Sequence, residues 1–266
     1  MYICINHQEN TTKDEKNFFV IGGYITPDAY QVVDIYKKVE RIIKKEKGLA
    51  IDTELKVEDC EEINQKFVLN SLLKTERILP FCVYYDVTKM RKNNLYLLRS
   101  RQDRFLFLLT HTLKIILEQE YSEEYQYINL EQEVILELNQ EEVTTFSQEQ
   151  IKNYLNHHNQ IFKTTKKLSA VSCLDSKSSF TIRAAKFFCH YFWSELVHQE
   201  ANQSLKESLE STIKHAKILN YPTNFLVNGR EPKPDHNQTK RTLEDYSPFD
   251  IGDVIELIFA IIFFWI

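Results

Sequence analysis

Four stretches of this chain carry polar side chains where regular elements are expected to begin or end. The first, MYICINHQEN, ends an apolar, strand-like run on Asn6. A carboxylate at such a strand end would suggest a metal ligand, whereas the amide of asparagine is primarily a hydrogen-bonding group. The other three are TELK with Glu54, the strand-like VILEL with Glu137, and LDSKSSFTIRAAKFF with Lys186.

The order of these stretches, with FFVIGGYIT between the first and the second, resembles the domain-of-unknown-function 3800 family. The resemblance covers residues 1 to about 195 and implies a ribonuclease-H-like fold. In that family the opening strand ends in Asp-Glu-Ser-Gly, a glutamate lies in Glu-x-Lys, an acid ends a middle strand and the last helix carries Gln-x-Ala-Asp. The resemblance implies that these acids meet at one end of the sheet and bind divalent metal, Mg²⁺ or Mn²⁺, for phosphodiester hydrolysis.

The match to those family motifs is partial. Glu54 and Lys56 fit the Glu-x-Lys element, and Glu137 can stand for the acid of the middle strand. The remaining positions depart from the family, with Asn6, His7, Gln8 and Glu9 in place of Asp-Glu-Ser-Gly, Arg183 in place of the glutamine and Lys186 in place of the last aspartate.

Charge counting at the four acidic positions predicts that two-metal catalysis is lost. A full set of acids would carry about four negative charges against the four positive charges of two Mg²⁺ ions. Asn6, Glu54, Glu137 and Lys186 together leave one net negative charge. Lys186 would also place an ammonium where a metal should lie, and at ~4 Å that repulsion costs several kcal/mol even at an effective dielectric constant of about 20.

Two nearby acids could replace the lost ligands. Glu9 lies three residues beyond Asn6, and Asp175 lies just before the last predicted helix. Each is more simply interpreted as a turn or cap residue. Ser178 or Ser179 is then the expected N-cap, and an acid beside the cap favours the positive end of the helix.

The last helix also carries a row of basic residues. Arg183, Lys186 and His190 follow i, i+3, i+7 spacing and share one helix face, so this face, together with Lys56, is a candidate for binding a phosphate or a carboxylate. The alternatives are an exposed face, or a salt bridge from Lys186 to one of the two remaining acids. We favour the salt bridge, since those acids would otherwise face each other without a metal.

The composition is that of an ordinary globular protein, with 266 residues of which 43% are apolar and 27% charged. A net charge of −5 gives no support for bulk attraction to nucleic acid, although a local basic groove is compatible with it. The five cysteines form no C-x-x-C pair, so we expect reduced, buried thiols in a cytoplasmic protein. Met1 leads straight into strand-like sequence, and we expect no signal peptide.

One segment is strongly acidic. Between Lys114 and Lys152 there are ten glutamates and no lysine or arginine. Because ionised carboxylates stay in water unless they are paired, we interpret most of this segment as a solvated surface.

Hydrophobic periodicity predicts a mixed β-sheet flanked by helices, which is the α/β class. Strands are expected at residues 2–5, 18–25, 79–87, 134–138 and 167–174. Helices are expected at 28–47, 59–74, 99–118 and 148–162, and loops over 220–253. A long helical stretch is expected over 178–217, either continuous or broken near Ala201. The Gly22-Gly23 pair suggests a bulge or a close backbone approach, and Gly48 a helix stop.

We divide the chain into a ribonuclease-H-like domain over residues 1–200 and a C-terminal helical and loop extension over 201–266. The extension ends in LIFAIIFFWI, residues 257–266, which is too short to span a bilayer because a spanning helix needs about 20 apolar residues. We expect it to be buried or to form a homo-oligomer contact, and attachment to a membrane is the alternative.

Two hypotheses about function follow. The first is a catalytically impaired relative of a metal-dependent nuclease that binds nucleic acid or a protein partner and needs no cofactor. The second is an active nuclease that uses Mg²⁺ or Mn²⁺ with Glu54, Glu137 and a substitute acid. The sequence leaves open whether the protein is an enzyme.

Overall fold

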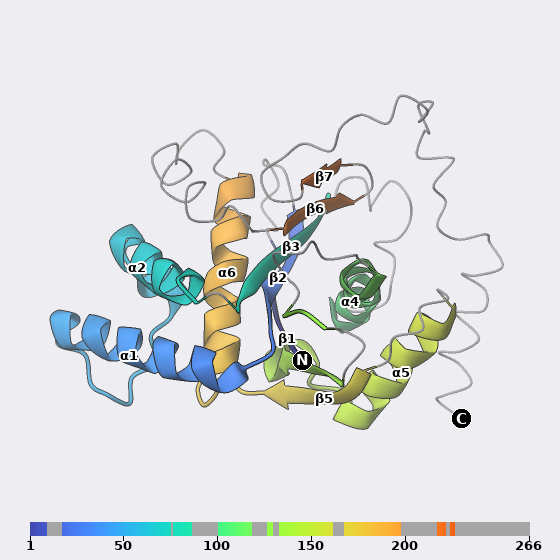
Figure 1. Ribbon diagram of the computed structural model, residues 1–266, viewed down its shortest axis with the longest axis horizontal. Helices are drawn as coiled ribbons and strands as arrows, with labels where there is room; N and C mark the ends of the chain where they lie inside the picture. Colours follow the sequence, from blue (N-terminus) through green and yellow to red (C-terminus); the bar gives the residue numbers. More distant parts are fainter. Residues whose placement is uncertain are drawn as a thin grey trace.

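A mixed β-sheet of seven strands forms the centre of the computed structural model, in the order β5-β4-β1-β2-β3-β6-β7 (Figure 1). The model describes residues 1–9, 18–75, 77–86, 101–118, 127–129, 133–161, 168–197, 217–221 and 224–226. The strands are β1 (Tyr2–Glu9), β2 (Phe18–Thr26), β3 (Leu79–Asp86), β4 (Val134–Asn139), β5 (Leu168–Leu174), β6 (Lys217–Tyr221) and β7 (Asn224–Leu226).

The directions of the strands give the sheet its type. β2 runs antiparallel to both β1 and β3, whereas β4 is parallel to β1 and β5 is parallel to β4. The sheet is therefore mixed, with the antiparallel strands β2 and β3 on one side of β1 and the parallel strands β4 and β5 on the other. The predicted fold class, a mixed sheet flanked by helices, is therefore confirmed.

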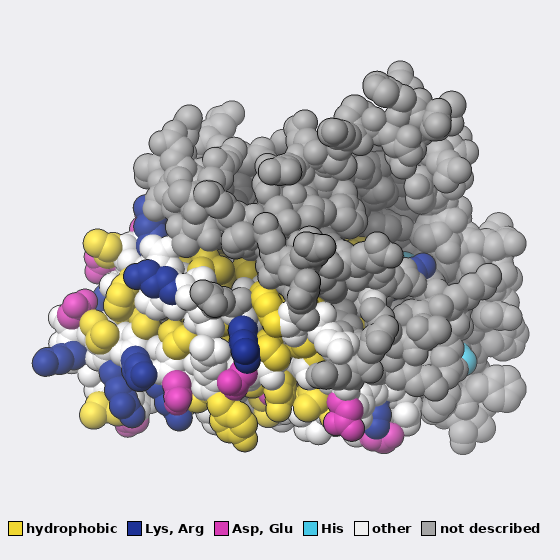
Figure 2. Space-filling model, viewed as in Figure 1, with side chains coloured by type: hydrophobic (Ala, Val, Ile, Leu, Met, Phe, Trp, Pro, Cys, Tyr) yellow, Lys and Arg dark blue, Asp and Glu magenta, His cyan; other side chains and the backbone are white. Residues whose placement is uncertain are grey.

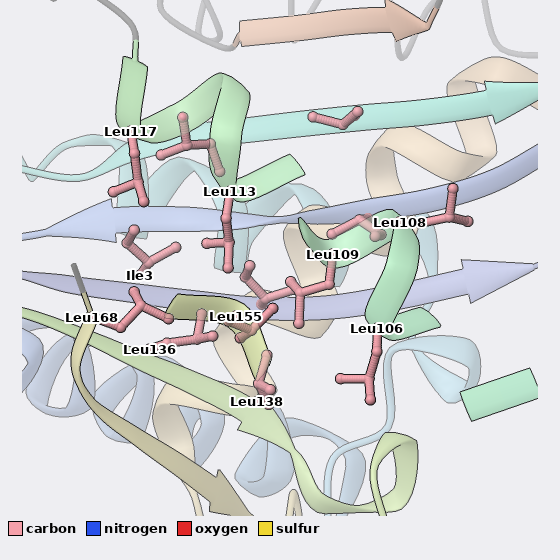
Figure 3. Packing of buried hydrophobic residues seen from close by; sticks show 14 of the residues in the cluster. Ile3, Leu106, Leu108, Leu109, Leu113, Leu117, Leu136, Leu138, Leu155 and Leu168 are labelled. Carbon is pink, nitrogen blue, oxygen red and sulfur yellow. The ribbon is translucent and has the colours of Figure 1, made fainter. Parts of the chain in front are cut away.

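Helices cover both faces of the sheet, and Figure 1 views the sheet nearly edge-on between them. They are α1 (Ala29–Lys47), α2 (Glu62–Leu73), α4 (Arg101–Glu118), α5 (Gln148–Ile161) and α6 (Phe180–Val197), with short 3₁₀ turns η1 (Val57–Asp59) and η4 (Gln140–Glu142). The first core lies beneath α4 and α5, and the second beneath α1, α2 and α6. Figure 3 shows the first core, in which leucines of α4 pack over Ile3, Leu136 and Leu138.

Alternation along β1 decides which core each of its side chains enters. Ile3 and Ile5 belong to the core beneath α4, whereas Cys4 belongs to the core beneath α6. Because successive residues of a strand point to opposite faces, Asn6 faces the α6 side and His7 faces the α4 side. The two neighbours therefore enter different surroundings, and this separation shapes the site described below.

The caps of α1 agree with the predicted helix. The Asp28 side chain accepts a hydrogen bond from the Gln31 backbone N–H, which satisfies a donor that the first turn leaves open. At the other end, Gly48 has φ +66°, and its N–H bonds the carbonyls of Lys44 and Lys45. The predicted stop at Gly48 is confirmed.

The two adjacent glycines of β2 permit close approaches on opposite sides. A Cβ at Gly23 would lie 1.9 Å from the carbonyl oxygen of Cys4 in the neighbouring strand. A Cβ at Gly22 would lie 3.0 Å from Cα of Cys189, where α6 crosses the sheet. The predicted close backbone approach is confirmed, and it lets α6 lie directly on β1 and β2.

Two predictions about the end of the chain need correction. Of the helical stretch expected over 178–217, α6 covers Phe180–Val197, residues 198–216 lie outside the described residues, and residue 217 begins a strand instead of ending the helix. The loop expected over 220–253 includes part of β6 and all of β7, since β6 pairs in parallel with β3 and β7 pairs with β6. The unpaired edge of β3 offers backbone donors and acceptors to any following extended segment, which local periodicity does not reveal.

The remaining expectations about the extension lie largely outside the described residues. These include the apolar tail 257–266 and hence its predicted oligomer contact. The division at residue 200 stays a prediction. Among the described residues, no helix has both the length and the apolar character needed to cross a membrane. The five cysteines are all free, and four of them are buried.

Candidate functional site at the end of strand β1

Two of the four predicted site residues meet in one cavity. Asn6, near the end of β1, and Lys186, in the second turn of α6, line a cavity of about 240 Å³ at the end of the sheet. Its other lining residues are His7, Gln8, Glu9, Val57, Glu58, Arg101, Asn139, Glu141, Glu142 and Cys189. Glu54 and Glu137 do not line it, so the prediction that all four positions form one site is only half met.

Asn6 lines this cavity with a side-chain amide whose oxygen is already bonded. Its Oδ1 accepts a hydrogen bond of 2.7 Å from the backbone N–H of His7. An N–H needs an acceptor, so this bond fixes which end of the amide is oxygen. Asn6 is 3% exposed, and its Nδ2 is buried without a hydrogen-bond partner. The polar side-chain atom of Asn6 that has no partner is therefore a donor, which cannot ligate a metal cation.

Lys186 is half-buried beside the turn that precedes α6. Its Nζ donates to Ser176 Oγ at 3.4 Å. Within the described part of the chain no carboxylate lies within 4.0 Å of this ammonium. The predicted salt bridge from Lys186 to Glu54 or Glu137 is therefore wrong.

Glu137 lies deeper along the sheet than the cavity. It is opposite Cys4 in the β1–β4 pairing, two residues before the end of β4, and the Cys4 thiol donates to its Oε2 at 3.5 Å. Burial raises the pKa of Cys4 well above its usual range, and the Glu137 carboxylate raises it further, so the thiol keeps its proton. This position beneath α6 is the physical reason why Glu137 misses both Lys186 and the cavity.

Arg183 forms a buried ion pair that joins α6 to α1. Its guanidinium bonds the Glu40 carboxylate, which also lies 3.4 Å from Lys44 Nζ, and it stacks on the Phe180 ring at 4.2 Å from the centroid. Arg183, Glu40 and Lys44 are all buried. The prediction that Arg183 forms a ligand-binding surface is wrong, because its charge is already neutralised inside the protein.

The remaining predicted site residues, Glu54, Lys56 and His190, do not line the cavity either. Glu54 is half-buried three residues before η1 and does not line the cavity. Lys56 is exposed just before η1. His190 packs near Trp193, with the ring centroids 5.8 Å apart. No joint basic surface of Arg183, Lys186 and His190 therefore faces the cavity.

The two proposed substitute acids differ in their positions. Glu9 lines the cavity, whereas Asp175 is exposed and accepts the Lys177 backbone N–H in the turn before α6. The Ser179 hydroxyl accepts the Ile182 N–H, which confirms Ser179 as the N-terminal cap. Asp175 is thus a turn residue, as the simpler interpretation held.

Sequence reasoning missed a polar triad on the other face of β1. The buried His7 ring is stacked on Phe19, with the centroids 4.9 Å apart. Arg101 Nη2 lies 3.2 Å from His7 Nε2, and a Glu142 oxygen lies 2.8 Å from His7 Nδ1, although off the direction of a ring N–H bond. Because arginine only donates, Nε2 of a neutral His7 accepts, and Nδ1 then carries a proton that makes no hydrogen bond to the nearby carboxylate. The triad ties β1 to α4 and η4.

The sum of charges around the cavity is negative. Four carboxylates and two cations line it, which leaves two net negative charges when the histidine is neutral. The carboxylates belong to Glu9, Glu58, Glu141 and Glu142, and the cations to Arg101 and Lys186. In the described ranges no group of three His, Cys, Asp or Glu side chains is placed to hold a metal ion. The donor set does not fit a pair of Mg²⁺ ions, despite the acidic surroundings.

Comparisons with known proteins include a distant structural likeness. No family model and no curated protein matches the chain. Among solved structures, a complex of PCNA and RNase HII from Archaeoglobus fulgidus is similar with 10% identity and a TM-score of 0.42, covering 79% of this chain and 87% of that chain. A likeness this weak carries no information about activity, and the resemblance to the domain-of-unknown-function 3800 family stays a prediction.

Proposed function

We propose that this protein binds nucleic acid through the cavity at the end of β1 and does not cleave it with metal ions. The observation that supports the proposal is that Asn6 and Lys186, which line the cavity, carry hydrogen-bond donors. Asn6 offers an amide nitrogen and Lys186 an ammonium at two positions where two-metal catalysis would need carboxylate oxygens.

The positive charge of Lys186 opposes the binding of a metal ion in this cavity. A divalent ion at ~4 Å from the Lys186 ammonium would meet a repulsion of about 8 kcal/mol at an effective dielectric constant of about 20. The paired Glu142 is already compensated by Arg101, which lies 3.7 Å away. The other three carboxylates also line the cavity, but Glu58 and Glu141 are exposed to solvent, so they offset only part of that repulsion.

Nucleic acid is the partner class that best fits the donors. Bases and phosphates both carry the acceptor atoms that an amide nitrogen and an ammonium require. The ribonuclease-H-like sheet and the family resemblance support the same class. In Figure 2 the Lys and Arg side chains of the described residues are scattered among hydrophobic and acidic ones, without a continuous basic track on the visible face. We therefore expect a local contact with a shallow dependence on salt.

The test combines a binding assay with a cleavage assay on the full chain. Fluorescence anisotropy with labelled single-stranded RNA and DNA should show binding, and gel analysis should show intact strands with Mg²⁺ or Mn²⁺ present. Lys186→Ala should weaken binding, whereas Lys177→Ala, which alters an exposed lysine in the adjacent turn, should not. Absence of any binding would refute the proposal and leave a protein partner as the alternative.

The second candidate is an active metal-dependent nuclease, and the four carboxylates around the cavity are the observation that favours it. In the form that sequence analysis gave it, this candidate needs Glu54, Glu137 and a substitute acid. Of these residues only Glu9 lines the cavity. Metal-dependent cleavage that is abolished by Glu9→Gln and by Glu58→Gln would establish the nuclease, since a contaminant would be insensitive to both changes.

A further inference from the structure

We propose that the cavity holds one nucleobase that carries a carbonyl oxygen and an exocyclic amine on the same edge, as guanine and cytosine do. This inference rests on the proposed function and specifies its ligand. It assigns the contact to a base, not to a phosphate.

Asn6 and Lys186 carry donors that a ligand with an acceptor atom would satisfy. Asn6 Nδ2 is buried without a partner, and its amide cannot turn over because Oδ1 already accepts the His7 N–H. An unsatisfied buried donor destabilises the empty cavity, so a ligand that supplies an acceptor removes that penalty. Lys186 Nζ, whose contact with Ser176 is long at 3.4 Å, is the second donor on this side. A carbonyl oxygen has two lone pairs and can accept from both.

Three carboxylates that line the cavity can accept hydrogen bonds from donors of the ligand. Glu58 and Glu141 are exposed carboxylates that line the cavity, and Glu9 is half-buried at the end of β1. Carboxylates accept hydrogen bonds from base amino groups, as in the recognition of cytosine N4 by acidic side chains. A base whose carbonyl oxygen accepts from Asn6 and Lys186 can turn its amine toward these carboxylates.

The net charge of the residues that line the cavity favours a neutral base over a phosphate as the ligand. With two net negative charges around it, the cavity repels an added phosphate, whereas a neutral base meets no such repulsion. Buried Val57 and Cys189 also contribute apolar wall against which a planar ring can pack. The volume of about 240 Å³ lies below the ~300–1,000 Å³ of drug-sized pockets, which suits a single base.

The experiment is competition against a labelled single-stranded oligonucleotide bound to the full chain. Guanosine and cytidine should displace it at concentrations about tenfold lower than adenosine, which lacks the carbonyl, or uridine, which lacks the amine. Inorganic phosphate should not displace it beyond its effect on ionic strength. Equal displacement by all four nucleosides, or efficient displacement by phosphate, would overturn the inference.

The matched variant is Asn6→Asp, which keeps an acceptor for the His7 N–H and replaces the donor nitrogen by an oxygen. We expect it to weaken guanosine and cytidine binding by about 10- to 100-fold, because two acceptors would then face each other. Unchanged affinity would contradict the inference. Should Asn6→Asp fail to fold by circular dichroism, Lys186→Met provides the same comparison. Oligonucleotide binding without base preference would refute only this inference, whereas absence of all nucleic-acid binding would refute the proposed function.

Discussion

The buried ion pair between α1 and α6 allows a direct test of the role assigned to Arg183. The substitution Arg183→Met removes the guanidinium and keeps an unbranched side chain of similar length at the contact with Phe180. We predict a large loss of stability and no loss of ligand binding, because the guanidinium is turned toward Glu40 and away from the cavity.

The magnitude follows from the surroundings of Glu40. Removing one partner of a buried pair costs ~3–5 kcal/mol, since a charge is left buried without compensation. Lys44 remains 3.4 Å from the Glu40 carboxylate after the substitution, so we expect the lower end, about 3 kcal/mol. For a chain of this size that corresponds to a fall in melting temperature of roughly 6–12 °C.

Urea-induced unfolding followed by circular dichroism measures this change. The double variant Glu40→Met/Arg183→Met should lose less than the sum of the two single variants, with a coupling energy of about 2 kcal/mol, because it leaves no unpaired charge. Lys66→Met is the matched surface control. Its partner Glu62 is 2.7 Å away but both side chains contact solvent, and we expect a loss below about 1 kcal/mol.

Two results would refute this reasoning. Arg183→Met within about 0.5 kcal/mol of the wild-type protein would mean that the pair is not buried in solution. Loss of oligonucleotide binding in a variant that remains folded would mean that Arg183 belongs to the binding surface, as its position in the sequence first suggested.

Three further predictions concern the sheet, the thiols and the triad. Gly23→Ala should destabilise the protein by more than about 3 kcal/mol in urea unfolding, because its Cβ would lie 1.9 Å from the Cys4 carbonyl oxygen; a soluble variant of wild-type stability would contradict the β1–β2 register. Burial raises the pKa of Cys60 to about 11, so the folded state holds this proton more tightly, and its contribution to stability, present in full below pH ~9, should be lost between pH ~9 and ~11. Urea midpoints across that range should fall less steeply in Cys60→Ala than in the wild type, and identical slopes would refute the assignment. Glu142→Gln should cost about 1–2 kcal/mol, whereas Arg101→Met, at a side chain 64% exposed, should cost less than about 1 kcal/mol; the reverse order would mean that the cation is the main partner of the buried histidine.

Much of the fold could be predicted because it rests on local signals. The helical period over residues 28–47, together with Asp28 and Gly48, located α1 and its ends. Alternating apolar residues and branched side chains located β1 to β5. The extension was predicted less well, since β6 forms by pairing with the edge of β3 and not from a strong signal of its own.

The candidate site was predictable only where it depends on strand and helix ends. Asn6 and Lys186 line the same cavity because β1 and α6 bring them together, as the family resemblance implied. Glu54 was chosen by motif, yet the turn η1 brings Glu58 to the cavity, and the backbone path of an irregular segment has no period to reveal it. Glu137 was chosen as a strand-end acid, but its register opposite Cys4 holds it two residues too deep.

The triad escaped prediction for a different reason. Glu142 lies in the acidic segment that we interpreted as solvated surface, and most residues of such a segment are. The available signal was His7 itself. Alternation along β1 puts it on the same face as two buried isoleucines, and a buried histidine needs partners for both ring nitrogens.

The central claim is that the cavity lined by Asn6 and Lys186 does not bind a pair of divalent ions, because both residues carry donors where metal ligands would be needed. The most direct test is the unfolding free energy of the full chain in urea, measured with and without Mn²⁺. We predict the same value in both conditions. An increase of about 2.7 kcal/mol, the gain from a ligand at ~100 times its dissociation constant, would contradict the claim if Glu58→Gln abolished it.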